Sequence, residues 1–358
     1  MRILHAADLH LATDERDYSL AVLDEMIETV ARERVELLLL AGDVFDTLAD
    51  AESLRDAVTA RLDLLAASCR PFYIPGNHEK LGATERRHIG LLSFGSRMTV
   101  TTELSLISIS NEVELLLVPH SENYDDYQSW DVSPKKSRLR IAVAHGSVTG
   151  LSFLGLGDEE GGGIIDPDLF AFHSVDYAAM GHIHAGRIQQ QPSGAIIAYP
   201  GSARVWRSGE VGERSMLLLD ITTGITPVKL PLAAAGQWRS MELPLAQDGS
   251  AESGPMLATA GPQDWLEVML TGVTDNDFVR DSAARTVEQA MAGRVRRLDI
   301  RKSGVMVLAG VSEEPVVRLF LEAWRTRFET ALESERGAWL CARTIGLAKS
   351  IAVVGSQS

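Results

Sequence analysis

The feature that most constrains the fold is the apolar run Leu37–Ala41, in which every residue is hydrophobic and which ends at Gly42-Asp43. A strand that is apolar at every position has both faces buried, which is typical of parallel sheets in α/β proteins. Upstream, Arg2–Ala7 has the pattern of another strand. Between the two strands, apolar residues recur on one helical face: Leu20, Leu23, Ile27 and Val30. The order strand, helix, strand therefore predicts an α/β sheet.

The pattern repeats once and then gives way to short strands. A helix carrying Leu54, Val58, Leu62 and Leu65 precedes the predicted strand Phe72–Ile74, which ends at Gly76-Asn77-His78-Glu79. Further strands are predicted over Leu106–Ile109, Glu114–Val118, Leu139–Ala144, Tyr177–Met180, Ala195–Tyr199 and Met216–Ile221. Polar residues recur where these strands end, and the carboxyl ends of strands are where open α/β sheets place their sites.

The pattern changes after Pro231. A strand around Met241–Leu243 leads into the Gly-, Ser-, Ala- and Pro-rich segment Gln247–Pro262, a linker or long loop. A small α+β domain is expected beyond it, with strands Trp265–Leu270 and Val295–Ile300 around the helix Asp277–Met291. Pro315 then opens an amphipathic helix with the apolar residues Val316, Leu319, Phe320, Ala323, Trp324, Phe328 and Leu332. We predict three parts: residues 1–235, a cap at 236–302, and a helical segment at 303–358.

Composition excludes several classes of protein. The chain has 358 residues, 45% of them hydrophobic, and neither a membrane-length apolar run nor a secretory signal is evident, so a cytoplasmic location is expected. Two isolated cysteines, Cys69 and Cys341, indicate free thiols. The net charge of −15 opposes non-specific binding to a polyanion such as DNA, which metals or local basic patches must then overcome.

Short polar segments at predicted strand ends carry the chemistry. They are Asp8-Leu9-His10, Gly42-Asp43-Val44-Phe45-Asp46, Gly76-Asn77-His78-Glu79, His145-Gly146 and Gly181-His182-Ile183-His184. In an extended chain, residues i and i+2 point the same way, so Asp8 and His10 can aim at one place, as can His182 and His184. Each segment alone has a simpler reading as a turn or a solvated histidine. Their occurrence together indicates a metal site.

The residue types indicate which metal. Carboxylate, imidazole and amide ligands suit manganese, iron or zinc better than calcium or a magnesium cage. An aspartate whose two oxygens reach different ions can hold a pair of metals about 3.5–4 Å apart. Asp43 is the candidate for this bridge.

These segments resemble the signature of the calcineurin-like metallophosphoesterase superfamily. Within it, the opening Ile3–His10, the segment Asp176–His184 and the turn Tyr199-Pro200-Gly201-Ser202 are similar to the SbcD exonuclease family. The resemblance implies an α/β fold in which two packed β-sheets are flanked by helices (αββα), with a small α+β cap domain and C-terminal helices.

The resemblance also implies residue roles. Asp8, His10, Asp43 and His184 would hold one manganese ion, and Asp43, Asn77, His145 and His182 the second, with iron, zinc or magnesium as alternatives. His78 would be the catalytic histidine that does not bind metal, with Glu79 beside it orienting its imidazole. Asp46 is a further supporting residue.

Candidate DNA contacts are less specific. Arg86 and Arg87 follow the Gly76 turn closely, and Tyr199, Arg204 and Trp206 flank the Pro-Gly turn, where an aromatic ring can stack a base. Packing is the alternative reading for the aromatic residues. Two basic runs can contact phosphates or be solvated faces: Lys135 to Arg140, and Arg294 to Lys302.

The sequence thus predicts a manganese-dependent 3′-to-5′ DNA exonuclease of double-strand break repair, with single-strand endonuclease activity as an option. The rivals are a phosphodiesterase or phosphatase for small substrates, and a DNA-end-binding scaffold for an ATPase. The resemblance adds an SbcC-type SMC-like ATPase as partner, docked through the C-terminal helices, although an apolar stripe more often reflects intrachain packing. A homodimer is a further expectation, and no membrane is expected.

Overall fold

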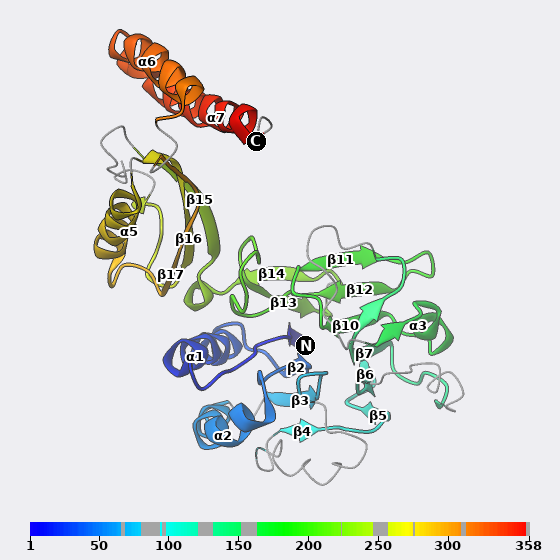
Figure 1. Cartoon of the computed structure of the whole chain (residues 1–358). Helices are drawn as coiled ribbons and strands as arrows, with labels where there is room; N and C mark the ends of the chain where they lie inside the picture. Colours follow the sequence, from blue (N-terminus) through cyan, green and yellow to red (C-terminus); the bar gives the residue numbers. More distant parts are fainter. Residues whose placement is uncertain are drawn as a thin grey trace. The chain divides into compact units, whose positions relative to one another are not determined.

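The computed structural model describes residues 1–65, 69–79, 94, 98–120, 132–151, 163–222, 224–245, 257–274, 276–308 and 313–355. The chain divides into two compact units, Met1–Gln237 and Trp238–Ser358. The N-terminal unit contains two six-stranded sheets. Seen along the strands in Figure 1, the two sheets form neighbouring layers, with α1 and α2 outside one sheet and α3 outside the other.

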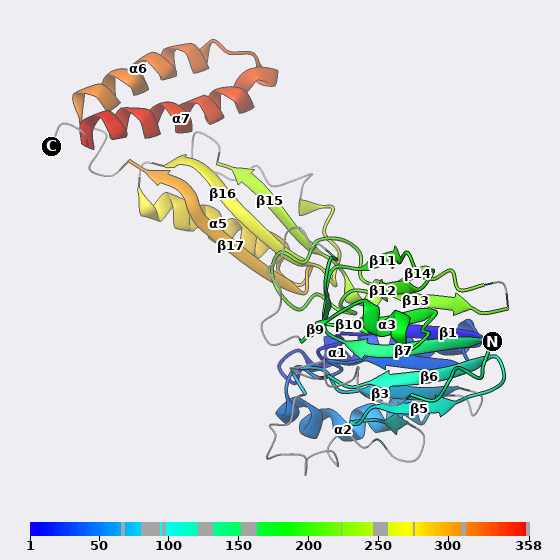
Figure 2. The same cartoon turned by 90° about the vertical axis from the view of Figure 1, so that its right-hand side faces the viewer.

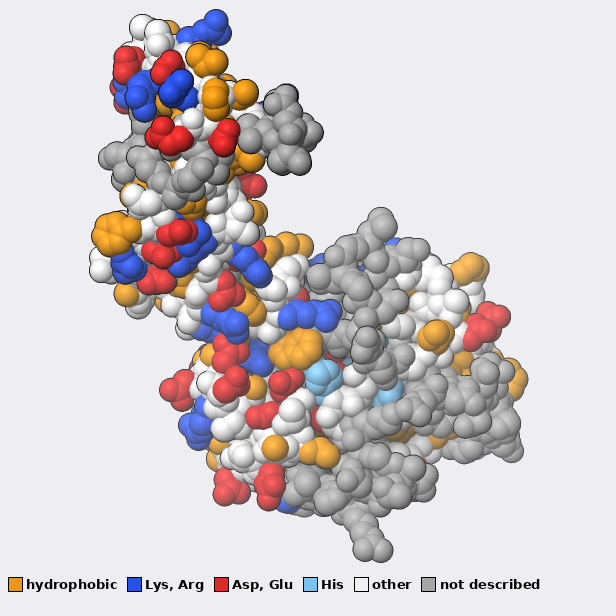
Figure 3. Space-filling model, in the orientation of Figure 1, with side chains coloured by type: hydrophobic (Ala, Val, Ile, Leu, Met, Phe, Trp, Pro, Cys, Tyr) orange, Lys and Arg blue, Asp and Glu red, His pale blue; other side chains and the backbone are white. Residues whose placement is uncertain are grey.

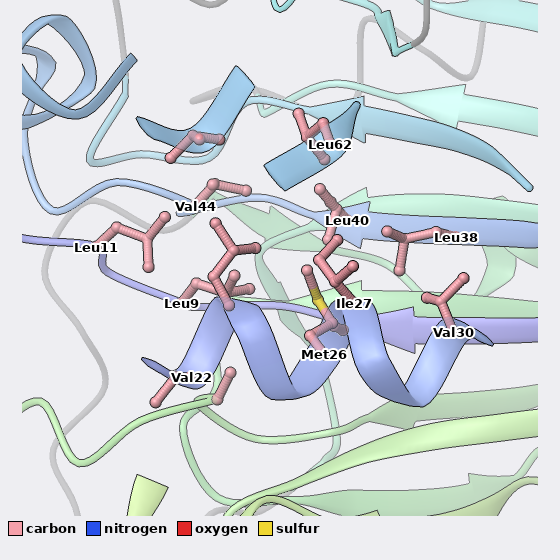
Figure 4. Close-up of a cluster of buried hydrophobic side chains, with 14 of the residues drawn as sticks. Leu9, Leu11, Val22, Met26, Ile27, Val30, Leu38, Leu40, Val44 and Leu62 are labelled. Carbon is pink, nitrogen blue, oxygen red and sulfur yellow. The ribbon is translucent and has the colours of Figure 1, made fainter. Parts of the chain in front are cut away.

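The first sheet has the strand order β14-β13-β1-β2-β3-β4, and β1, β2, β3 and β4 run parallel. Its strands are β1 (Arg2–Ala6), β2 (Leu37–Ala41), β3 (Arg70–Ile74), β4 (Thr99–Val100), β13 (Ser215–Asp220) and β14 (Val228–Pro231). The crossover helices are α1 (Arg16–Arg32) and α2 (Leu48–Leu62), and Thr47 caps α2 by accepting a hydrogen bond from the Asp50 amide at 3.1 Å. Figure 4 shows Ile27 and Val30 of α1 packed against Leu38 and Leu40 of β2.

The second sheet has the order β11-β12-β10-β7-β6-β5. Its strands are β5 (Ser105–Ser108), β6 (Val113–Val118), β7 (Leu139–His145), β10 (Tyr177–Gly181), β11 (Arg187–Gln190) and β12 (Ile196–Tyr199). The strands β8 (Ser147–Val148) and β9 (Ile164–Ile165) form a small separate pair, and α3 (Asp168–Phe172) packs on the outer face. Figure 2 shows the strands of both sheets along their length.

The all-apolar strand β2 explains why two sheets stack. Leu38 and Leu40 belong to the core beneath α1 and α2, whereas Leu37 and Leu39 belong to the core between the sheets. Alternate side chains of a strand point to opposite faces, so a strand with a layer on each side must be apolar throughout. The predicted pair of packed sheets flanked by helices is confirmed.

The C-terminal unit is a separate α+β structure. Its parallel sheet is β15 (Trp238–Pro244), β16 (Trp265–Thr274) and β17 (Arg297–Val307), and α5 (Asp277–Met291) connects β16 to β17 and covers one sheet face. Asn276 caps α5 by accepting from the Val279 amide at 3.1 Å. The helices α6 (Pro315–Glu329) and α7 (Arg336–Gly355) pack on each other, and Val317 and Leu347 share a small core with Val273.

The sequence missed the shorter and more polar elements. It did not predict β11 or β14, whose residues are all partly or fully exposed. In the described part of the chain, none of the helices has the length and apolar character that a membrane crossing requires. The predicted boundaries at residues 235 and 302 stay a prediction.

Candidate metal centre

Loops that follow parallel strands bring the predicted ligands together. Asp8 and His10 follow β1, Asp43 follows β2 and Asn77 follows β3 in the first sheet, while His145 ends β7 and His182 and His184 follow β10 in the second. The loops after β1 and β2 are joined by backbone hydrogen bonds, including one of 3.1 Å from the Asp8 amide to the Gly42 carbonyl. Figure 3 shows histidine side chains at the surface of the N-terminal unit, beside acidic and basic side chains.

The backbone is strained where these ligands lie. Asp8, His10, Asp43 and His182 have positive φ values of 52°, 42°, 48° and 97°. Such conformations cost roughly 1–3 kcal/mol each in non-glycine residues and persist only where the surroundings enforce them. Strain of this kind clusters at functional sites, so it supports the predicted site at this end of the sheets.

Glycines make room for the ligand side chains. A Cβ at Gly42 would lie 2.1 Å from Nδ1 of His145, and one at Gly76 would lie 2.2 Å from Oδ1 of Asp43. A Cβ at Gly181 would lie 1.8 Å from the Ala41 carbonyl oxygen. Any side chain at these positions would displace a ligand or a strand.

The first cluster consists of Asp8, His10 and His184, all buried, whose candidate ligand atoms lie within 4.8 Å of one another. Nδ1 of His184 is hydrogen-bonded to the carboxylate of Glu210, and Nδ1 of His10 lies 3.3 Å from Oδ1 of Asp46. The contact with Glu210 leaves Nε2 of His184 as an acceptor, and this atom faces Nε2 of His10 at 3.0 Å.

The second cluster consists of Asp43, His145 and His182, which are also buried, together with Asn77. Nδ1 of His145 donates to the Ala41 carbonyl at 2.8 Å, and its Nε2 lies 3.2 Å from Oδ2 of Asp43. Oδ1 of Asn77 lies 2.8 Å from Nε2 of His145 and 3.1 Å from Nδ1 of His182. The amide oxygen thus completes a set of ligand atoms that converge on one point.

Burial and mutual attraction set the charges. Burial raises the pKa of Asp8 to about 7, partly offset by His145. Burial also opposes ionisation of Asp43, but the adjacent His145 imidazolium holds the pKa of that carboxyl well below its usual range. Burial opposes the charge on His145 as well, yet Asp43 raises the pKa of His145 to about 10. Asp43 and His145 therefore favour each other's charged forms.

The donor set fits divalent cations. Burial lowers the pKa of His10 to about 4, so its imidazole is neutral at pH 7, and its Nε2 and that of His184 lie close enough to bind one cation. Within the described residues, Oδ2 of Asp43 is a buried oxygen without a hydrogen bond of acceptable geometry. Carboxylate, imidazole and amide ligands together suit manganese, iron or zinc.

His78 lies at the edge of the centre with its side chain partly exposed. Its amide donates to Oδ1 of Asp43 at 3.0 Å, and its Nδ1 donates to the Asp46 carbonyl at 2.9 Å. Its ring contacts that of His10 edge-on, with centroids 4.7 Å apart. Nε2 of His78 is thereby left as the ring nitrogen that can meet a substrate.

The sequence profile of the family described as calcineurin-like phosphoesterases matches residues 1–186, more than half of the chain. The chain belongs to the calcineurin-like phosphoesterase family. Two relatives are each 26% identical to it. The uncharacterized metallophosphoesterase YhaO of Bacillus subtilis aligns over 255 residues, 63% of this chain and 58% of YhaO. The DNA double-strand break repair protein Mre11 of Saccharolobus solfataricus aligns over 232 residues, 59% of this chain and 56% of Mre11.

The chain therefore covers less than two thirds of the length of either relative. Among solved structures, a dimetal phosphatase from Danio rerio is similar at a TM-score of 0.37 and 13% identity, over 61% of this chain and 91% of the phosphatase. Membership of the SbcD-type family stays a prediction within the calcineurin-like phosphoesterases.

One predicted role within the phosphoesterase centre needs correction. Glu79 does not orient His78; its two carboxylate oxygens accept hydrogen bonds from the Phe45 amide at 2.8 Å and the Gly76 amide at 3.0 Å. Glu79 therefore ties together the loops that follow β2 and β3. Asp46 contacts both His10 and His78 instead.

Two predicted DNA contacts are also wrong. Tyr199 is fully buried, and its hydroxyl donates to the Gly146 carbonyl at 2.8 Å, so its ring cannot stack a base. Arg204 is buried and paired with Glu15 at 2.7 Å.

Trp206 differs from these two residues because it reaches the centre. It is partly exposed and stacks on the His10 ring, with centroids 4.4 Å apart and an angle of 15°. Arg86 and Arg87 lie outside the described residues.

Three of the four basic side chains in the first predicted run are paired with acidic side chains of the phosphoesterase unit. Lys135 pairs with Asp176 at 2.6 Å, Arg138 with Glu112 at 2.6 Å, and the buried Arg140 with Glu114 at 2.7 Å. These side chains join the second sheet to its loops. The run is therefore a structural network in this unit.

Glu210 is the residue that the sequence analysis missed. It is buried and touches the predicted ligand His184, although it lies 26 positions further along the chain. The only signal in the sequence was the pair Gly209-Glu210 in a loop otherwise rich in basic and small residues. Such a pair is too common to single out.

Proposed function

We propose that this chain is a two-cation phosphodiesterase that cleaves DNA. Asp8, His10, Asp43 and His184 would hold one cation, and Asp43, Asn77, His145 and His182 the other. The observation that carries the proposal is the convergence of two buried ligand clusters, each centred on a carboxylate, at one end of the stacked sheets.

Bound cations supply the chemistry of such a centre: they polarise the phosphoryl oxygens and lower the pKa of a bound water. The chain's own residues orient the substrate and move protons. His78 stands at the exposed edge with Nδ1 engaged by the Asp46 carbonyl. In the imidazolium form of the ring, Nε2 can donate a proton to the leaving oxygen or a hydrogen bond to the phosphoryl group.

DNA as the substrate is supported by the similarity to an archaeal DNA double-strand break repair protein. On this basis we propose a manganese-dependent 3′-to-5′ exonuclease, with single-strand endonuclease activity as a second mode. A cytoplasmic location and a homodimer remain predictions.

A small phosphodiester is the second candidate, and a specific observation favours it. The chain carries a net charge of −15, and its first basic run is paired with acidic side chains. A small ester demands no basic surface, whereas a long polyanion does.

The proposed SbcC-type SMC-like ATPase partner is supported by exposed apolar residues on the C-terminal helices. Leu319 is 63% exposed and Ile345 is 57% exposed, whereas Trp324 and Phe328 pack within the hairpin. Part of the predicted apolar stripe of α6, with Trp324 and Phe328, is thus buried within the chain. Another part, with Leu319, is exposed.

One experiment tests the proposal. The full chain is stripped of metal, supplied with manganese, and incubated with 3′-labelled single-stranded DNA, labelled duplex DNA or bis(p-nitrophenyl) phosphate. We expect DNA degradation, its near-complete loss in Asp43→Asn, and a decrease in kcat of roughly 10²–10⁴-fold in His78→Ala. Glu213→Gln, an exposed change in the nearby loop, is the control.

Hydrolysis of the small ester without any DNA degradation would reject the nuclease in favour of the second candidate. Tight DNA binding with equal residual activity in both variants would instead indicate a scaffold.

A further inference from the structure

We propose that Glu210 is a positioning residue that sets His184 for cation binding and holds Trp206 over His10. The inference rests on the proposed two-cation function, which it deepens by assigning a support to one of the two sites.

The first contact concerns His184. The side chain of Glu210 is fully buried, and Oε1 is hydrogen-bonded to Nδ1 of His184. A carboxylate cannot donate, so the imidazole proton must lie on Nδ1. The Nε2 lone pair is then directed at the position that faces Nε2 of His10. A carboxylate behind a ligand histidine fixes its ring and makes it a stronger ligand.

The second contact concerns Trp206. Oε2 of Glu210 accepts a hydrogen bond from the Trp206 amide at 2.9 Å. The indole, fixed in this way, stacks on His10 and meets the rings of His78 and His184 edge-on, at 5.2 Å and 5.3 Å. The Glu210 carboxylate therefore contacts His184 directly and, through Trp206, keeps an aromatic ring stacked on His10.

A buried carboxylate is costly without compensation, and arginines provide it. Nη1 of Arg214 lies 3.8 Å from Oε2 of Glu210, and Nε of Arg207 lies 3.8 Å from Oε1. Arg214 also donates to Ser202 at 2.8 Å and to the Val211 carbonyl at 2.8 Å. The loop that contains Arg207 and Arg214 therefore surrounds the Glu210 carboxylate. These contacts hold the carboxylate at a fixed distance from His184.

The other site has a different support. There, Nδ1 of His145 donates to the backbone carbonyl of Ala41, which no side-chain substitution removes. Loss of the Glu210 charge should consequently weaken one cation site and spare the other.

The test is a manganese titration of the metal-stripped full chain by calorimetry, with Glu210→Gln and the matched control Glu213→Gln. We expect two sites in the unmodified protein. In Glu210→Gln, one site should weaken by roughly 10–100-fold while the other keeps its Kd. Glu213→Gln should bind both ions as the unmodified protein does, because Glu213 is exposed.

Two further measurements keep the inference open to refutation if Glu210→Gln folds poorly. Glu210→Asp restores the charge and should recover part of the lost affinity. In the unmodified metal-free protein, the ¹⁵N spectrum of the histidine rings, assigned with His184→Gln, should show the proton of His184 on Nδ1.

Two ions bound with unchanged Kd in Glu210→Gln, equal weakening of both sites, or a His184 proton on Nε2 would overturn the inference. If the unmodified protein binds no manganese, the proposed function itself fails, which is a separate outcome.

Discussion

The two ligand clusters lie side by side, yet they are supported in different ways. Side chains support the first: Glu210 stands behind His184, Asp46 lies beside His10, and Trp206 covers the His10 ring. Backbone supports the second: the Ala41 carbonyl fixes His145, and glycines leave the space that its ring needs. A site held by side chains can be adjusted by single substitutions, whereas a site held by strand backbone changes only when the strands move.

This difference predicts which substitutions do most damage. Gly181→Ala would place a methyl group 1.8 Å from the Ala41 carbonyl oxygen and 2.8 Å from Nδ1 of His145. Because backbone must shift, we expect the unfolding free energy to fall by about 3–5 kcal/mol and the second cation site to be lost. Denaturant melts and manganese titration measure both.

The matched control is Gly337→Ala, because a Cβ at Gly337 meets no atom within 4 Å. Near-normal manganese binding in a folded Gly181→Ala protein would contradict the view that backbone positions the second cluster.

Manganese should stabilise the folded protein through each of the two sites, and Glu210→Gln should reduce only the contribution of the first. A cation at 100 times its Kd stabilises the folded state by about 2.7 kcal/mol per site. If Glu210→Gln weakens one site by 10- to 100-fold, that site should contribute about 1.4 to 0.4 kcal/mol at the same concentration. Thermal melts with and without manganese give these values, and an undiminished gain in the variant would show that Glu210 supports neither site.

Removing the Trp206 indole that stacks on His10 should have a smaller effect on manganese binding. Trp206→Ala removes a stacked ring, an interaction worth about 0.5–1.5 kcal/mol, so we expect manganese binding at the first site to weaken by roughly 2–10-fold. Trp206→Phe should retain most of the affinity. Equal weakening at both sites, measured by the same titration, would argue against a local cover on His10.

The smallest effect on the centre is expected from Tyr199→Phe. The Tyr199 hydroxyl bridges the Gly146 carbonyl and the Val148 amide, at 2.8 Å and 3.2 Å. Its loss should lower the unfolding free energy by about 1–3 kcal/mol while KM for DNA stays unchanged. A rise in KM without loss of stability would instead show that the hydroxyl serves the substrate rather than the bridge between Gly146 and Val148.

Much of the architecture could be predicted because it follows from local pattern. The all-apolar run Leu37–Ala41 is a strand with a layer on each face, and Asp277–Met291 and the helix opened by Pro315 begin where they were expected. These elements depend on hydrophobic periodicity and capping, which neighbouring residues carry. The candidate ligands could be proposed for the same reason, since each directly follows a recognisable strand.

What supports the ligands was decided by the tertiary structure alone. Glu79 was expected beside His78 because they are adjacent in sequence, but its side chain points back to the amides of Phe45 and Gly76. Glu210 reaches His184 across a loop, and Tyr199 and Arg204 are buried together with the turn between them. Sequence by itself determined which side chains stand at the strand ends. Only the packing of two sheets and their loops decided which carboxylate meets which imidazole, because those contacts join residues that no periodic pattern relates.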